Sequence, residues 1–138
     1  MGTSLGTARF NVSGRGRSSS YVGAAVERRG RALLSHDVVT VTLDWLLERY
    51  FAPTVIKIDV EGLELEVLKG GSKVFAQARP CVLCEVQEQN AKAVTSLFHD
   101  AGYELFDLGA APPRRPPSLA SWNTAAVHRQ SPIPRLSA

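Results

Sequence analysis

The sequence predicts an α/β fold with a mostly parallel sheet, because short apolar stretches alternate with stretches of helical periodicity. The first apolar stretch, residues 55–60, is rich in β-branched residues, which is typical of a strand buried on both faces of a parallel sheet. With 138 residues, the chain is long enough for one domain with a sizeable core.

Four strands and two helices are expected after residue 54. Glu61, Glu64 and Glu66 crowd the start of the first helix, and Gly70-Gly71 follows its end, as the helix dipole and capping rules favour. The second helix can be capped by Asn90 and has one apolar face. The expected strands cover residues 55–60, 81–86, 103–108 and 123–128, and the expected helices cover residues 63–69 and 90–101.

The pattern is weaker upstream. Residues 38–42 are rich in β-branched residues and predict a strand, and a helical pattern of apolar residues follows as far as Tyr50. Residues 8–12 are compatible with a short strand. The expected organisation is an irregular, basic segment over residues 1–37, the α/β domain over residues 38–128 and a mobile tail over residues 129–138.

Charge is unevenly distributed along the chain. The net charge is +3, but residues 44–107 carry eleven acidic and six basic side chains, whereas the two flanks carry ten basic and two acidic ones. The flanking arginines lack the interleaved aromatic residues of a nucleic-acid site. We therefore expect solvated loops and no nucleic-acid partner.

The sequence gives no sign of a membrane span or a secretory signal. No run of about 18 apolar residues occurs, and the first residues have neither the basic nor the apolar region of a signal peptide. Two cysteines do not make a disulfide framework. We expect a cytoplasmic protein without a membrane partner.

Neither the cysteines nor the histidines predict a metal site. Cys81 and Cys84 have the CxxC spacing, but side chains three residues apart in a strand point to opposite faces. Two buried structural thiols are therefore expected. The three histidines share no ligand spacing.

Asp59 and Glu61 are the leading catalytic candidates. Ligands of open α/β sheets bind beyond the carboxyl ends of the strands, where both residues lie. A carboxylate there can hydrogen-bond a hydroxyl, accept its proton or hold a divalent cation. The alternative is structural: Asp59 pairs with Lys57 or Lys69, and Glu61 serves the helix dipole.

Glu64 and Glu85 are weaker candidates, for contacts with a substrate. Glu64 lies one helical turn after Glu61. Glu85 ends the neighbouring strand, and neighbouring strands lie about 4.8 Å apart, so Glu85 and Asp59 are expected at the same rim. A purely structural role is equally compatible with the pattern, with Glu85 as a cap of the helix that begins near Asn90.

Four motifs occur in order between Val38 and His128. They are Val41-Thr42-Leu43-Asp44; Lys57-Ile58-Asp59-Val60-Glu61-Gly62 with Glu64 and Leu68-Lys69-Gly70-Gly71; Arg79-Pro80 leading to Glu85-Val86; and Trp122-Asn123 through His128. Together they resemble the FkbM-type methyltransferases, which use S-adenosylmethionine and have the Rossmann-like class I methyltransferase fold. The resemblance implies O-methylation of a hydroxyl on a sugar, glycan or natural product.

The resemblance also implies an antiparallel last strand, whose start would bring Asn123 to the crevice as a further substrate contact. It requires a cofactor-binding strand and a glycine-rich turn upstream of Val55, and residues 1–54 show no such pattern. We therefore expect a partial, carboxyl-terminal piece of the fold that binds S-adenosylmethionine weakly or not at all and is inactive alone. An uncovered sheet edge would then favour self-association. The competing interpretation is a non-catalytic module that binds a partner or a small ligand.

Overall fold

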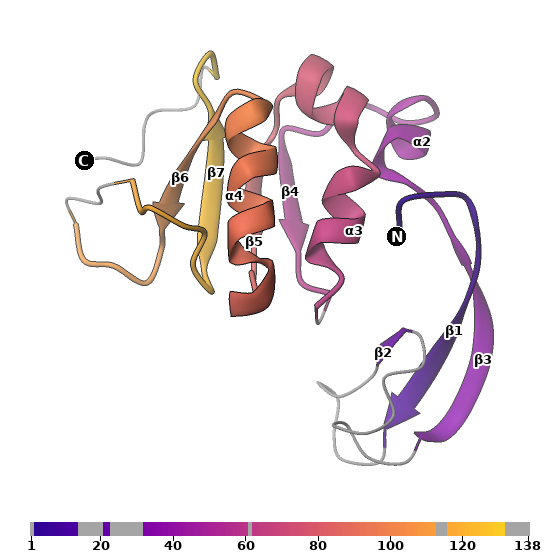
Figure 1. Cartoon of the computed structure of the whole chain (residues 1–138). Coiled ribbons are helices and arrows are strands. Elements are labelled where there is room, and N and C mark those ends of the chain that lie inside the picture. The colour runs from indigo at the N-terminus through magenta and orange to yellow at the C-terminus, as the bar shows by residue number, and fades with distance from the viewer. Residues whose placement is uncertain (1, 14–20, 23–31, 61, 113–115, 132–138) are drawn as a thin grey trace.

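The computed structural model describes residues 2–13, 21–22, 32–60, 62–112 and 116–131. Within these residues the chain forms a four-stranded core sheet, with helices over one face, and a separate three-stranded sheet near the N-terminus (Figure 1). No helix in these ranges is long and apolar enough to cross a membrane.

The core sheet has the strand order β4-β5-β7-β6. Strands β4 (Val55–Ile58) and β5 (Cys81–Cys84) are parallel, whereas β7 (Thr124–His128) is antiparallel to β5 and to β6 (Tyr103–Asp107). Three strands thus point one way, and the last strand runs against them. The predicted α/β fold and the antiparallel last strand are confirmed, in a sheet that is mixed.

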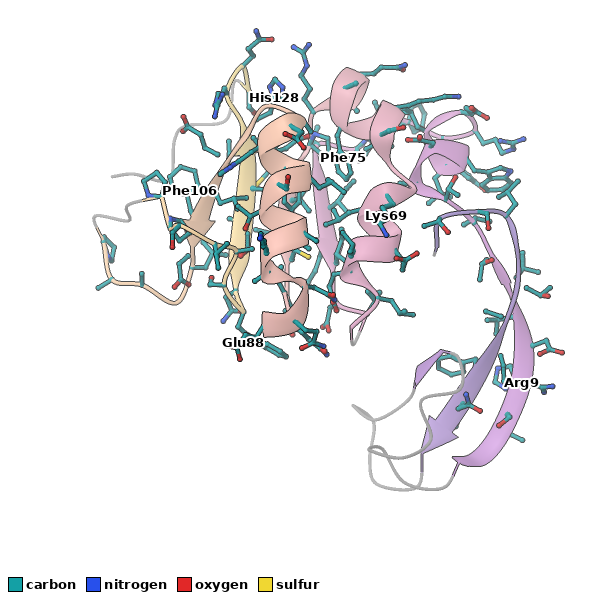
Figure 2. All side chains as sticks on the ribbon, viewed as in Figure 1. Arg9, Lys69, Phe75, Glu88, Phe106 and His128 are labelled. Atoms are coloured by element: carbon teal, nitrogen blue, oxygen red, sulfur yellow. The ribbon has the colours of Figure 1, made fainter. Side chains whose placement is uncertain are left out.

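Two helical connections cover one face of this sheet (Figure 1). Helix α3 (Glu64–Lys69) and the π-helical turn η2 (Val74–Ala78) join β4 to β5, and the 3-10 turn η3 (Glu88–Asn90) and helix α4 (Ala91–Asp100) join β5 to β6. The rings of Phe75, Phe98 and Tyr103 pack edge to face or tilted, with centroids 5.5–5.9 Å apart. Phe75 lies between the helices and the sheet (Figure 2).

The second face of the sheet carries its own small apolar cluster. It consists of Cys81, Phe106, Ala125 and Val127, with Leu83 packed against them. Alternation along the strands produces this division, because successive side chains of a strand point to opposite faces. Cys84 belongs instead to the cluster under the helices.

The N-terminal sheet contains the short strand expected over residues 8–12, but the pairing of this strand with two others was not predicted. Strand β1 (Gly6–Ser13) pairs antiparallel with β3 (Ala32–Thr40) and with the short β2 (Tyr21–Val22). The expectation of an irregular segment over residues 1–37 is therefore wrong for its described parts, and the strand predicted over residues 38–42 is the end of a longer one. Arg9 projects from this sheet, away from the core (Figure 2). Most described side chains of β1 and β3 are exposed, so they lack the burial pattern that identifies a core strand.

The carboxyl-terminal tail was predicted to be mobile over residues 129–138. Residues 132–138 lie outside the described part of the chain, so this stays a prediction.

Asp44 joins the N-terminal region to the core. It lies in helix α2 (Leu43–Leu47), which is capped by Thr42 through a 3.0 Å hydrogen bond from the Trp45 N–H to Oγ1. The Asp44 carboxylate accepts hydrogen bonds from the Ser72 hydroxyl and from two backbone N–H groups at the start of η2, over 3.0–3.2 Å. The Asp44 N–H donates to the carbonyl of Gly70 at 3.0 Å.

Glycine at position 71 permits this close packing. A Cβ atom there would lie 2.8 Å from Leu43 Cδ1 and 2.9 Å from Phe75 Cε2, and both neighbours are buried. The neighbours would have to shift to admit it, since core side chains have little free space around them.

Gly71→Ala is accordingly expected to destabilise the fold by about 1–3 kcal/mol, because the added methyl overpacks the junction between α2 and η2. Gly6→Ala is the matched control, since a Cβ at Gly6 would meet its nearest atom at an ordinary 3.8 Å. Urea unfolding followed by circular dichroism measures both variants. Equal stabilities for the two would contradict the packing argument.

Candidate functional site

Three charged side chains meet where β4 and β5 end. The Lys57 ammonium donates hydrogen bonds to Asp59 Oδ2 at 3.1 Å and to Glu85 Oε1 at 3.0 Å. All three side chains are partly exposed. One cation thus lies between two carboxylates, at the edge of the sheet where ligands of α/β proteins bind.

Strand geometry explains this grouping. Ile56 and Ile58 face the core under the helices, so Lys57 between them faces the opposite side of the sheet. The parallel pairing of β4 with β5 aligns Ile58 with Cys84, and the Glu85 N–H donates to the Ile58 carbonyl at 3.0 Å. Asp59 and Glu85 therefore leave their strands side by side, as predicted.

A small cavity of about 140 Å³ opens beside the cluster. Asn123 reaches it because β7 runs antiparallel and begins next to the end of β5. The carbonyl of Asn123 accepts a 2.8 Å hydrogen bond from the N–H of Leu108. The lining residues are Lys57, Leu83, Cys84, Glu85, Leu108, Asn123 and Thr124. The cavity is smaller than the roughly 300 Å³ at which ligand pockets usually begin, so it fits one polar group of a ligand.

Lys57 stays charged at neutral pH. Hydrogen bonds to Glu85 and then to Asp59 raise the pKa of the Lys57 ammonium above its ordinary value. It therefore cannot act as a general base, and it occupies the place between the carboxylates that a divalent cation would take. Within the described residues, no group of three or more His, Cys, Asp or Glu side chains could hold a metal ion.

Glu64 is placed differently from the other candidates. Its side chain is buried, with a residue exposure of 1%. Its carboxylate accepts hydrogen bonds from the Gly62 N–H at 2.7 Å and from Asn90 Nδ2 at 3.3 Å. Gly62 has a positive φ of 101°, so the turn after β4 depends on glycine and is supported by this carboxylate. These contacts give Glu64 a structural role at the turn, and its predicted contact with a substrate stays a prediction.

Glu61 and Asn90 were also expected to have roles here. Glu61, the second catalytic candidate, lies outside the described residues. Asn90 makes no side-chain cap to α4 and donates instead to the Gly62 carbonyl at 3.2 Å and to Glu64. The pairing of Asp59 with Lys57, which was the structural alternative, is present, and Glu85 shares the same lysine.

Lys57 is the one member of the cluster that sequence reasoning treated only as a partner for Asp59. The sequence does place Lys57 beside Asp59, because residues two apart at the end of a strand lie on the same side of the sheet. What the pattern could not show is that Glu85 reaches the same ammonium from the neighbouring strand. Leu108 was also missed, since its position beside Asn123 depends on the antiparallel pairing of β6 with β7.

The cysteines behave as expected from their strand. Cys81 and Cys84 are free, buried and assigned to clusters on opposite faces of the sheet. Burial raises the pKa of the Cys84 thiol to about 12 and also raises that of Cys81. Both are neutral thiols near neutral pH, so they are poor nucleophiles and metal ligands.

An open groove of about 940 Å³ lies between η2 and α4, on the face covered by helices. Its lining includes Phe75, Leu97, Asp100 and His128 but none of the strand-end carboxylates. The carboxylates of the predicted site therefore lie away from this groove.

The family of the chain follows from a comparison with protein-family models. The model of the methyltransferase FkbM domain matches residues 2–105. The chain belongs to the FkbM methyltransferase family. The match begins well before Val38, so the N-terminal sheet of this FkbM domain is part of it. Neither the search of curated proteins nor the search of solved structures finds a match.

The structural role of Glu64 is testable with a matched neighbour. Glu64→Ala removes the acceptor of the Gly62 N–H and one of the two acceptors of Asn90 Nδ2, both partly buried, and is expected to cost about 1–3 kcal/mol of stability. Glu66→Ala, in the same first turn of α3, removes only an exposed pair with Lys69 and should cost about 0.5 kcal/mol or less. Chemical denaturation measures both free energies of unfolding. A Glu64→Ala protein as stable as Glu66→Ala would restore the substrate-contact interpretation.

Proposed function

We propose that this chain carries the acceptor side of an S-adenosylmethionine-dependent O-methyltransferase site. The observation that supports it is the pair of carboxylates, Asp59 and Glu85, held around Lys57 in an FkbM methyltransferase domain, with Lys57 and Glu85 lining a small cavity. The acceptor is a hydroxyl of a sugar, glycan or natural product, as the family resemblance implies.

The arrangement suits the handling of a hydroxyl. Lys57 takes one oxygen of each carboxylate, and among the described residues nothing donates to Asp59 Oδ1 or to Glu85 Oε2. Glu85 lines the cavity, so its free oxygen is available to a hydroxyl there, and Asp59 beside it offers a second free oxygen at the rim. Asn123, which also lines the cavity, offers a further hydrogen-bonding group to orient the hydroxyl.

Asp59 is the proposed proton acceptor. As a hydroxyl oxygen is methylated it gains positive charge, and its proton becomes acidic enough to pass to a neighbouring carboxylate. Lys57 orients the two carboxylates through its hydrogen bonds, and Glu85 holds the hydroxyl in place. In this proposal Lys57 is a positioning residue.

S-adenosylmethionine, when bound, supplies the methyl group. Within the described residues, β4 is the first strand of the core sheet, and β1–β3 form an antiparallel sheet instead of a strand, glycine-rich turn and helix. The described residues therefore do not fit the cofactor's nucleoside, and we assign none of them to it. The contribution proposed for this chain is confined to the acceptor hydroxyl.

A non-catalytic module is the second candidate. Lys57 neutralises part of the charge of its two partners, so the cluster is stable without a substrate, and the cavity takes a small polar group. Such a site can bind a hydroxyl-bearing ligand without chemistry. The two functions differ in their dependence on Asp59 for turnover.

The catalytic proposal predicts that Asp59→Asn lowers turnover by about 10²-fold or more, because an amide cannot accept the proton. Turnover is measured in an active methyltransferase that contains this segment, with thermal unfolding recorded for each variant. Asp59 is partly exposed, so the melting temperature should change little. Asp100→Asn, an exposed position on α4, is the control and should retain full turnover. Near-normal turnover in a folded Asp59→Asn enzyme would overturn the assignment of Asp59 as the proton acceptor.

A second expectation concerns the cofactor. The chain alone should bind S-adenosylmethionine weakly or not at all, because its described residues offer no site for the nucleoside. Isothermal titration calorimetry with S-adenosylmethionine, and with S-adenosylhomocysteine as a second titrant, measures this. Saturable micromolar binding would show that the chain contains a cofactor site after all.

A further inference from the structure

Strand β4 is an edge of the core sheet (Figure 1), so the backbone groups of alternate residues point away from the sheet. The carbonyl of Thr54 accepts a hydrogen bond from the Cys81 N–H, and that of Ile58 accepts one from the Glu85 N–H. Alternate residues of a parallel strand bond to the same neighbour, so Val55 and Lys57 direct both backbone groups away from β5. Among the described residues, nothing hydrogen-bonds to these outward groups.

The surface beside this edge is apolar. Phe51 is 99% exposed, Tyr50 66% and Val55 54%. They border a cavity of about 320 Å³ whose other lining residues, such as Leu46, come from α2, β4, η2 and the connecting segment. Within the described residues, β1–β3 form a separate sheet, and none of these strands pairs with β4. An unpaired strand next to apolar surface is a site for pairing with another chain.

We propose that a second copy of this chain pairs with this edge, β4 against β4 in antiparallel orientation, around a two-fold axis at Ile56. In this register Val55 of each copy lies opposite Lys57 of the other. Each such pair exchanges two N–H···O=C bonds, so the dimer gains four. Ile56 meets its counterpart on the face covered by helices, and the two core sheets become one continuous sheet.

The chemistry of the neighbouring residues selects this register. The outward N–H and C=O groups of one strand must face those of the other strand. Because these groups belong to alternate residues, the two-fold axis has to pass through a residue and not between two residues. An axis at Lys57 would put the two ammonium groups opposite each other, which is destabilising. An axis at Val55 would put Lys57 opposite Pro53, which has no N–H to donate. An axis at Ile58 would extend the pairing past the end of β4. Only the Ile56 register keeps all pairs within the strand and separates the lysines.

Charge substitutions at Val55 test this arrangement. Sedimentation velocity over a hundredfold concentration range should show a concentration-dependent dimer of the full chain. Val55→Lys places an ammonium opposite Lys57 at two points and should weaken dimerisation at least about tenfold. Val55→Glu places a carboxylate there and should dimerise at least as tightly as the wild type. Val39→Lys, at a 79% exposed strand position in the N-terminal sheet, is the matched control and should behave as the wild type.

Circular dichroism establishes that each variant is folded, as expected for substitutions of exposed side chains. A folded wild-type chain that is monomeric over the whole range overturns the proposal. So does a dimer that responds equally to Val55→Lys and Val55→Glu, because it must use another surface. Neither measurement involves methyl transfer, so the outcome is independent of the proposed catalytic role.

Discussion

The Asp44 carboxylate is the interaction on which the arrangement of this chain depends. It satisfies the free N–H groups at the start of η2, while the Asp44 N–H bonds to the Gly70 carbonyl. These contacts fasten α2 and the strand before it to the core, and Gly71 admits them because it has no side chain. Two of the motifs shared with the family, around Asp44 and around Gly70-Gly71, are therefore two halves of one structural junction.

The central motif divides into residues that support the turn and residues that form the rim. Gly62 and Glu64 shape the chain after β4 and tie it to Asn90 at the start of α4. Lys57 and Asp59 lie at the rim and remain partly exposed. Burial thus separates Glu64 from the exposed rim carboxylates. The turn formed by Gly62 and Glu64 follows Asp59 directly. The residues that support the turn therefore help to hold the Asp59 carboxylate at the rim.

The core elements were predictable because their apolar residues follow the periodicity of burial: β4 to β7, α3 and α4 all occur where the sequence indicated. The N-terminal sheet could not be predicted as a sheet, because most described side chains of β1 and β3 are exposed and lack the burial periodicity of a core strand. Within the site, Asp59, Glu85 and Asn123 were brought together by strand direction, which the sequence order implies. The structural role of Glu64 was hidden, since it depends on a contact with Asn90, 26 residues away.

Lys57 connects the site to the proposed dimer. Its side chain lies between the carboxylates, and its backbone faces the open edge of β4. Val55 and Lys57 both point to the face opposite the helices, so the Ile56 register would place the charged clusters of both copies on one face of the joined sheet. From strand spacing and rise, the two Lys57 Cα atoms would lie about 8 Å apart. Each cluster carries a net charge of −1, since one lysine faces two carboxylates. A ligand at one site would therefore feel the charge of the other, and binding at the two sites would be electrostatically coupled.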